Sequence, residues 1–243
     1  TTMAIQLICG PEFKITGQPS LEKLAFTGSS NEYLLWPKAV QFCADRNSVL
    51  QSLREAIGFR TQANGANDAN EYQATRTAAI YFVANDKRYV AFDDDADPDN
   101  NIILTRAQEG HDACHKKNVW HLPMNDTHVK QIMARAEKDG RIVEVPKENE
   151  WPLNHNYTEQ PIVKASMGDI VGANEQFLIN KGYKNGGVWT PDQTSEDKAD
   201  VRAMGLGDNY NDCLDSVYAN WHVGIVGRAR GVRGTPEALQ WKP

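Results

Sequence analysis

Histidines gather in one short stretch of this chain. Residues 110–128 read GHDACHKKNVWHLPMNDTH and contain four of the six histidines, together with one cysteine. Zinc in proteins is held by imidazole nitrogens and thiolate sulfurs that lie about 2.0 to 2.3 Å from the ion. His111 and His115 are four positions apart, which places both on one face if this piece is helical. The stretch therefore predicts a divalent metal site, for zinc or magnesium, with Cys114, His115 and His121 as ligands.

The end of this stretch suggests a catalytic role for such an ion. The segment NVWHLPMNDTHVKQI, residues 118–132, resembles the closing half of an HNH-type ββα-metal nuclease. In that family an asparagine precedes the helix and a histidine in the helix helps to hold one divalent cation. Asn118 and His128 take these places, and His111 is the upstream candidate for the general base, although GHDACHKK lacks the family's apolar strand. The resemblance implies phosphodiester hydrolysis, in which the ion stabilises negative charge while a neutral histidine takes a proton from water.

A second cysteine and histidine lie near the C-terminus, in NDCLDSVYANWHVGIVG. The piece HVGIVG resembles the histidine strand of NlpC/P60-type cysteine peptidases, and Cys213 resembles the start of their nucleophile helix. In that family the two residues are far apart in the chain and meet in space. Here both lie in one short segment, so Cys114 is the remaining thiol that could partner His222.

An acidic segment, FDDDADPDNN, follows the clearest strand pattern in the chain. Its alternating aspartates, Asp95, Asp97 and Asp99, resemble the calcium loop of an EF-hand. The turn glycine of that loop is replaced by Asn100, and its last ligand, a glutamate, is replaced by Arg106. We therefore expect a solvated acidic turn rather than a specific ion site.

The segment GRARGVRG is the one local basic feature of an acidic chain. Guanidinium groups can bind phosphate through two parallel hydrogen bonds. Arg228, Arg230 and Arg233 are therefore candidate phosphate-binding residues. The alternative is that this basic segment pairs with acidic neighbours such as residues 93–99, and composition does not separate the two.

Composition limits the class of protein. The chain has 243 residues, a net charge of −6 and 40% hydrophobic residues, which is ordinary for a soluble globular protein. No apolar run approaches the roughly 20 residues that span a bilayer, and the first residues lack the basic region of a secretory signal. The four cysteines are too few for a disulfide framework. We expect a cytoplasmic protein with reduced thiols and no membrane partner.

The pattern of elements predicts an α+β fold. AAIYFVANDKRYVAF, residues 78–92, is typical of a β-hairpin, and helices are expected over 37–59, with a bend at Asn47, and from about 125 to 140. We expect a small antiparallel sheet around this central hairpin, with helices packed on one side. Further expected elements are helices at 20–26, 166–180, 195–204 and 212–220 and strands at 102–104, 141–145 and 221–226. The segment 146–161 is the candidate linker between an α+β domain, 1–146, and a more helical part, 162–243, which is either separate or packed into the same domain.

Two classes of function remain open at this stage. The first is a metal-dependent hydrolase that acts on phosphoester or nucleic-acid substrates through the His/Asn cluster at 111–128. The second is a non-enzymatic binding or assembly protein that uses the polar loops at 61–73 and 93–101 and the Arg-rich tail. The expected ligand is a phosphate-containing molecule or a protein partner.

Overall fold

A long β-hairpin lies at the centre of the molecule. The structure is a computed structural model that describes residues 24–62, 71–117, 119–154, 156–207 and 216–234. Strand β4 (Gln73–Ala84) pairs in antiparallel fashion with β5 (Lys87–Asp93). The turn residues Asn85 and Asp86 have φ values of 51° and 60°, a left-handed conformation that Asn and Asp tolerate better than most residues. The predicted hairpin is confirmed.

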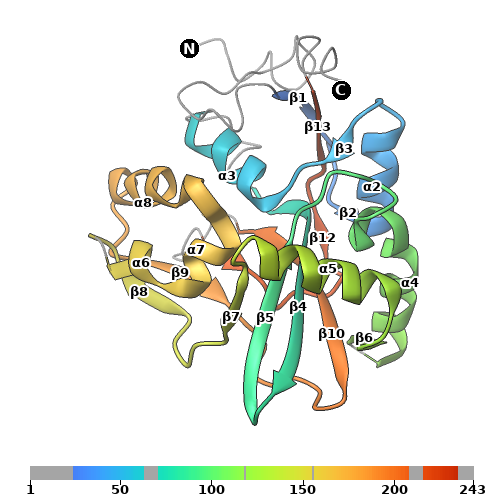
Figure 1. Cartoon of the computed structure of the whole chain (residues 1–243). Helices are drawn as coiled ribbons and strands as arrows, with labels where there is room; N and C mark the ends of the chain where they lie inside the picture. The colour runs from blue at the N-terminus through green and yellow to red at the C-terminus, as the bar shows by residue number, and fades with distance from the viewer. Residues whose placement is uncertain (1–23, 63–70, 118, 155, 208–215, 235–243) are drawn as a thin grey trace.

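Within the described residues, eight strands form the largest sheet, in the order β7-β5-β4-β10-β11-β9-β8, with β6 also paired to β10. The pairs are antiparallel except β11 with β9, so the sheet is mixed. Figure 1 shows β4, β5 and β10 side by side in the middle of the fold. The other strands are β6 (Trp120–Pro123), β7 (Ile142–Glu144), β8 (Glu150–Pro152), β9 (Asn185–Trp189), β10 (Lys198–Leu206) and β11 (Val217–Tyr218).

Two smaller sheets join segments from the two ends of the described chain. β1 (Leu24–Ser29) pairs with β13 (Arg230–Gly234), which also pairs with β3 (Val49–Leu50). β2 (Leu34–Leu35) pairs with β12 (Val226–Gly227). The first and the last described strands are therefore neighbours, and residues near 33 and near 226 lie close together.

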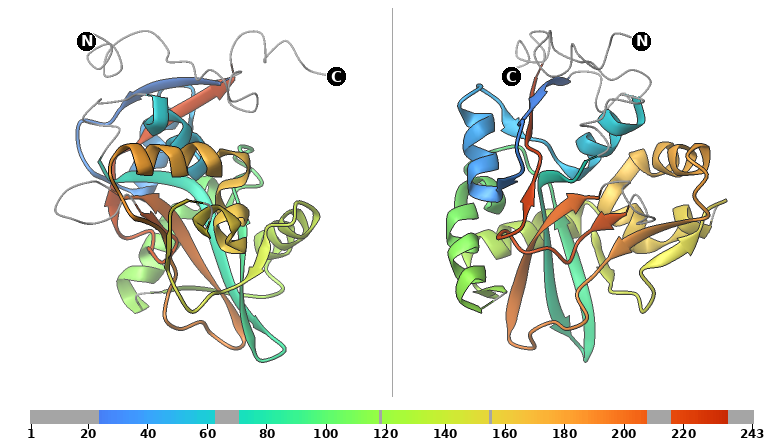
Figure 2. Two further views of the ribbon diagram at one scale, coloured as in Figure 1. Left: turned by 90° about the vertical axis from the view of Figure 1, so that its left-hand side faces the viewer. Right: turned by 180° about the vertical axis from the view of Figure 1, so that it is seen from behind.

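Helices cover both faces of the large sheet. Ala79 and Tyr81 of β4 belong to a core with α3, α7 and α8, whereas Ala78 and Ile80 belong to a second core with α2, α4 and α5. This split follows from the alternation of side chains along a strand. In Figure 2, α2 and α4 lie on one side and α6 to α8 on the other. The helices are α2 (Trp36–Ala44), α3 (Leu53–Gln62), α4 (Ile102–Lys117), α5 (Thr127–Lys138), α6 (Asn156–Glu159), α7 (Pro161–Met167), the 3-10 turn η2 (Gly168–Ile170) and α8 (Val171–Asn180).

The predicted fold class, α+β, is confirmed, while the predicted sheet matches only roughly. The sheet is larger than expected and is partly parallel, and helices pack on both of its faces. The division into residues 1–146 and 162–243 stays a prediction. β10, from the second range, is paired with β4 and β6 from the first.

Several predicted elements are wrong, each for a local reason. Residues 102–104 are the first turn of α4, not a strand, because the side chain of Asn101 accepts hydrogen bonds from the N–H groups of Ile103 and Leu104. Residues 198–204 belong to strand β10, whose alternate side chains are buried on opposite faces, so its apolar pattern is not that of a helix. The described residues 24–26 are strand, and only Val226 of the predicted strand 221–226 lies in a strand.

Other elements are confirmed. The region predicted as helical, 37–59, contains α2 and α3 with a bend at Asn47, which has a φ of 50°, but Val49–Leu50 between them form strand β3 and not helix. Helix α5 begins after Asp126, whose carboxylate accepts from the N–H groups of His128 and Val129. The strand predicted at 141–145 is β7, and the region 166–180 is helical in three pieces. The predicted helix 212–220 begins outside the described residues, and its residues 217–218 form β11.

Candidate binding site

The histidines of the 110–128 stretch occupy different environments. His111 and His115 lie on α4 with their ring centroids 4.3 Å apart. His121 lies on β6, where its Nδ1 is 2.7 Å from Oδ1 of Asp200. His128 lies in the first turn of α5, with Nδ1 3.4 Å from a guanidinium nitrogen of Arg106. His111 and His115 are thus neighbours of each other, whereas His121 and His128 each contact a different residue.

The predicted metal site is not assembled. Within the part of the chain that the structure describes, no group of three or more His, Cys, Asp or Glu side chains is arranged to hold a metal ion. Cys114, His115 and His121 come from α4 and β6 and do not form such a group. Asn118, expected to act with His111 and His128, lies outside the described residues. The described part of the stretch is rich in ligand atoms but does not bring three of them to one point.

The structure does bring Cys114 close to the turn that contains His222. The sulfur of Cys114 accepts hydrogen bonds from the backbone of Val223 and Gly224, yet burial raises the pKa of this thiol. Nδ1 of His222 accepts the N–H of Gly224 at 3.1 Å, and burial, with Arg202 nearby, lowers the pKa of this imidazole. The arrangement favours an uncharged thiol and an uncharged imidazole that stabilise a turn. Cys213 lies outside the described residues.

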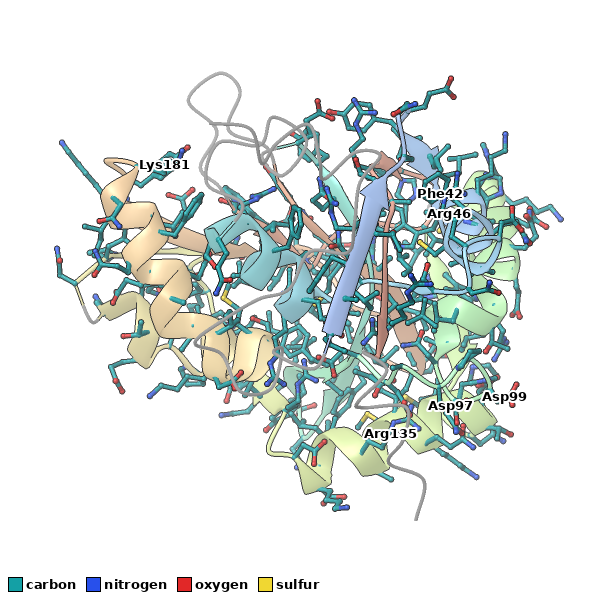
Figure 3. The ribbon with its side chains drawn as sticks, turned by 90° about the horizontal axis from the view of Figure 1, so that it is seen from above. Phe42, Arg46, Asp97, Asp99, Arg135 and Lys181 are labelled. Atoms are coloured by element: carbon teal, nitrogen blue, oxygen red, sulfur yellow. The ribbon has the colours of Figure 1, made fainter. Side chains whose placement is uncertain are left out.

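The acidic segment at 93–99 is held by arginines. Both carboxylate oxygens of Asp93 accept from Arg135, at 3.0 and 2.9 Å, and Asp94 accepts from Arg141 at 2.6 Å. Arg135 of α5 also lies 3.6 Å from Asp95, and Figure 3 labels Arg135 together with the exposed Asp97 and Asp99 of this segment. Burial raises the pKa of Asp93, and the hydrogen bonds from Arg135 oppose that rise. The segment therefore has a structural role in attaching α5 and β7 to the end of β5.

The arginines of the C-terminal segment are used inside the fold. Arg228 pairs with Glu71 and donates to the carbonyl of Ser30 at 3.0 Å. Arg230 is fully buried, and its guanidinium carbon lies 3.7 Å from the ring centroid of Phe59. Arg233 is exposed. The guanidinium groups of Arg228 and Arg230 thus help to hold β13 and its neighbours, and their role in phosphate binding stays a prediction.

A surface cavity lined by aromatic and apolar side chains lies elsewhere. We name this cavity, of about 490 Å³, the aromatic pocket, and its lining residues are Tyr33, Tyr72, Trp221, Ile225 and Val226. Two of these side chains, Tyr33 at 41% and Val226 at 42% exposure, are large hydrophobic groups that the fold leaves in water. Exposed apolar groups that gather around a hollow mark a binding surface more often than scattered ones do. The pocket is therefore the candidate binding site.

The ring of Trp221 is the centre of this pocket. It stacks on Tyr218 with centroids 4.8 Å apart and an interplanar angle of 20°, and Tyr72 lies 5.2 Å away. The fully buried Trp36 contacts the Trp221 ring edge to face, with the two ring centroids 6.2 Å apart. The ring also requires glycine at position 205 of β10, because a Cβ there would lie 2.6 Å from the indole. The floor of the pocket is therefore rigid, while Tyr33 and Val226 form its open rim.

Backbone hydrogen bonds hold the three segments of the pocket together. The N–H of Arg228 donates to the carbonyl of Tyr72 at 2.7 Å, and the carbonyl of Arg228 accepts from Ala74 at 2.9 Å. The guanidinium of Arg228 lies 4.8 Å from the ring centroid of Tyr33. Because main-chain atoms make most of these contacts, the frame of the pocket depends little on the side chains at its rim.

Sequence reasoning missed this site because it followed titratable residues. The lining residues lie near positions 33, 72 and 221–226, and no spacing rule connects segments so far apart. The nearest sequence signal is the pair of rings in SVYANWH, at Tyr218 and Trp221, next to the histidine that drew attention instead.

Comparison with known proteins bears on the fold. No protein-family model and no curated protein matches the chain. A solved structure does match, with a TM-score of 0.63 and 13% sequence identity over 84% of this chain and 97% of the other. It is described as "Accommodation of massive sequence variation in Nanoarchaeota by the C-type lectin fold". At this identity the likeness shows the fold alone: this chain has a C-type lectin-like fold.

The expectation of a metal-dependent hydrolase is therefore wrong. The fold is similar to that of a C-type lectin-fold protein, and the described residues hold no metal-binding group. The expectations of a hydrolase, a zinc protein and a nuclease-like protein, which came from residues 111–128, are wrong for the same reasons. In the described part of the chain, no helix is both long enough and apolar enough to cross a membrane.

Proposed function

We propose that this protein is a non-enzymatic binding protein that contacts a partner protein through the aromatic pocket. One observation carries the proposal: two exposed side chains, Tyr33 and Val226, form the rim of a cavity whose floor is the stacked ring of Trp221. The lining residues come from separate segments that backbone hydrogen bonds fix in place. A preformed apolar cavity of this kind can bind a ligand without the cost of ordering itself.

The chemistry of the pocket suits a protein partner. Tyrosine and tryptophan supply large contact areas at low entropic cost, and they are enriched among the residues that dominate binding energy at protein interfaces. Arg228, which pairs with Glu71, lies against the ring of Tyr33 and so brings a polar group next to the apolar lining, as is typical of such interfaces. We therefore expect an apolar or aromatic side chain of the partner to enter the cavity.

The fold neighbour suggests a second property of this surface. In that protein's case, the C-type lectin fold is described as accommodating massive sequence variation. In this chain the frame of the pocket rests on main-chain hydrogen bonds, on Gly205 and on the buried Arg230. We propose that Tyr33 and Val226, which lie outside this frame, can be exchanged for other residues without loss of the fold, so that the pocket can differ in specificity.

Two finer expectations stay proposals. A phosphate-containing ligand at Arg228, Arg230 and Arg233 has the exposed Arg233 as its main support. A divalent metal ion, zinc or magnesium, is the other finer expectation, and no group of three or more His, Cys, Asp or Glu side chains in the described residues is arranged to hold one. Isothermal titration of the purified protein with each probe tests both.

Selection from a displayed peptide library tests the proposed function. Peptides that bind the wild-type protein are measured against Tyr33→Ala and against Met124→Ala, a matched control because Met124 is an apolar side chain of similar exposure, 39%. We expect Tyr33→Ala to weaken binding about tenfold, the effect of removing a contact worth about 1.4 kcal/mol. Met124→Ala should bind as the wild type does. Equal binding by both variants, or selection of no peptide, would contradict the proposal, and binding of a sugar in place of any peptide would change the ligand class.

A further inference from the structure

A second cavity, of about 550 Å³, lies at the outer edge of β6 and β10. Its lining includes His121 and Val119 beside β6, Asp200 and Arg202 on β10, and the loop 191–195. None of these residues lines the aromatic pocket. The volume is that of an ordinary small-molecule site. We name this cavity the Arg202 pocket.

Arg202 is a buried cation without a carboxylate partner. It is 8% exposed, one of its terminal nitrogens donates to the carbonyl of Asn220 at 3.1 Å, and its Nε has no hydrogen-bond partner. Among the described residues, Arg202 takes part in no ion pair. Other buried or partly buried arginines do: Arg76 pairs with Glu55, Arg135 with Asp93 and Arg141 with Asp94. A buried charge without a partner is costly, so the contrast points to a missing anion.

The nearest carboxylate on the same strand is already engaged. Asp200 is two positions before Arg202, so both side chains point to the same face of β10. One carboxylate oxygen of Asp200 lies 2.7 Å from Nδ1 of His121, and the other accepts from the N–H of Ser195 at 3.2 Å. Asp192 also borders the cavity, but it is exposed, where water screens its charge.

Two other polar side chains of the cavity, His121 and Thr194, are held in place by hydrogen bonds. The carboxylate of Asp200 fixes the hydrogen of His121 on Nδ1, which leaves Nε2 of the ring as a polar atom beside the ligand. Thr194 accepts from Nε of Arg88 at 3.0 Å, so its own hydroxyl hydrogen can be donated. Arg88 also donates to the carbonyls of Pro191 and Asp192, which fixes the loop that forms this wall.

We propose that the Arg202 pocket binds the oxyanion group, carboxylate or phosphate, of a small molecule, with Arg202 as the counter-charge, Thr194 as a hydrogen-bond donor and the His121 ring beside them. The apolar side chains of Val119 and Pro191 are left for the rest of the ligand. This proposal does not depend on partner binding at the aromatic pocket, because the two cavities share no residue.

Titration of the purified protein with inorganic phosphate, acetate and chloride at matched ionic strength tests the proposal. The readouts are the NMR signal of the His121 ring and the melting temperature. We expect phosphate or acetate to shift the His121 signal in a saturable way and to raise the melting temperature, while chloride does neither. A response to phosphate alone identifies a phosphate group, a response to acetate alone a carboxylate, and a response to both an oxyanion in general. No saturable response to either probe at concentrations up to about 50 mM would overturn the proposal.

Variants locate the response. Arg202→Met should abolish it and, in chloride, should melt no lower than the wild type, because the variant removes a buried unpaired charge and keeps an apolar side chain of similar length. Arg46→Met is the matched control, since Arg46 is an exposed arginine that lines neither pocket, and it should respond as the wild type does. Loss of the response in Arg46→Met with its retention in Arg202→Met would overturn the proposal. If Arg202→Met does not fold, Thr194→Val serves instead, because it removes the donating hydroxyl and keeps the His121 ring, with an expected several-fold loss of affinity.

Discussion

The 110–128 stretch and the aromatic pocket are opposite kinds of region. The stretch concentrates reactive residue types within a few turns of chain, yet His111, His121 and His128 each meet a different neighbour. The pocket joins residues from positions 33, 72 and 221–226, none of which is reactive, into one cavity. Proximity in sequence did not produce a site, whereas pairing of distant strands did.

The reason lies in the elements between the histidines. His111 and His115 are on α4. The chain then forms β6, which contains His121, and α5, which contains His128, so these two histidines lie on other elements. The pocket, in contrast, forms where β2 and β12 pair and where Arg228 meets Tyr72 through the main chain. Long-range backbone pairing places Tyr33 next to Val226, and no local pattern records that pairing.

The largest effect is expected from filling the space beneath the pocket. Gly205→Val would place its Cβ 2.6 Å from the ring of Trp221, and overpacking of this kind costs about 3 kcal/mol of unfolding free energy. Urea unfolding measures this loss. Gly172→Ala is the control, because a Cβ at this position in α8 meets nothing within 4 Å and alanine favours a helix. Equal stability of Gly205→Val and the wild type would show that Trp221 does not form a rigid floor.

The second-largest loss of stability is expected from a change at Asp200, the residue that contacts His121. Asp200→Asn can still accept from His121, but its amide group would face the N–H of Ser195, so a buried hydrogen bond is lost. We expect a cost of about 2 kcal/mol in unfolding free energy. Asp112→Asn, at the exposed contact with His111, should change stability by less than about 0.5 kcal/mol. A reversal of this order would mean that His121 is not held by Asp200.

Acid should weaken the turn beside Trp221. The pKa of His222 is lowered from its ordinary 6.5, chiefly by burial and then by Arg202, so below pH 6.5 the unfolded chain takes up a proton more readily than the folded one. The stability from His222 is therefore complete above 6.5 and falls as the pH drops from there toward the folded-state pKa. Melting temperatures between about pH 7.5 and 5.5 should show the fall, and His222→Asn, which keeps an acceptor for Gly224, should show less of it. The same slope in both proteins would assign the effect to other groups.

The smallest effect on stability is expected at the rim of the pocket. Tyr33→Ala removes an exposed ring that the frame does not need, so unfolding free energy should change by about 0.5 kcal/mol or less. Thermal unfolding beside Met124→Ala provides the comparison. A much larger loss would place Tyr33 in the frame and would remove the argument that rim residues can be exchanged.

The sequence could predict features that depend on neighbouring residues, but not those that depend on contacts between distant segments. The hairpin at Asn85-Asp86, the bend at Asn47 and helix α5 follow from local patterns and were predicted. Strand β10 was mistaken for a helix because it is buried on both faces, which removes the alternation by which strands are recognised. The candidate sites depend on contacts between distant segments. Arg230, a candidate phosphate ligand whose role stays a prediction, is fully buried, and Trp221 gave no signal of the residues it would meet.

The central claim is that binding occurs at the aromatic pocket and not at the histidine stretch. The most direct test measures the affinity of one library-selected peptide for the wild type, Tyr33→Ala and His128→Ala. We predict an approximately tenfold loss with Tyr33→Ala and no change with His128→Ala. A loss with His128→Ala and full affinity in Tyr33→Ala would contradict the account and return the site to residues 110–128.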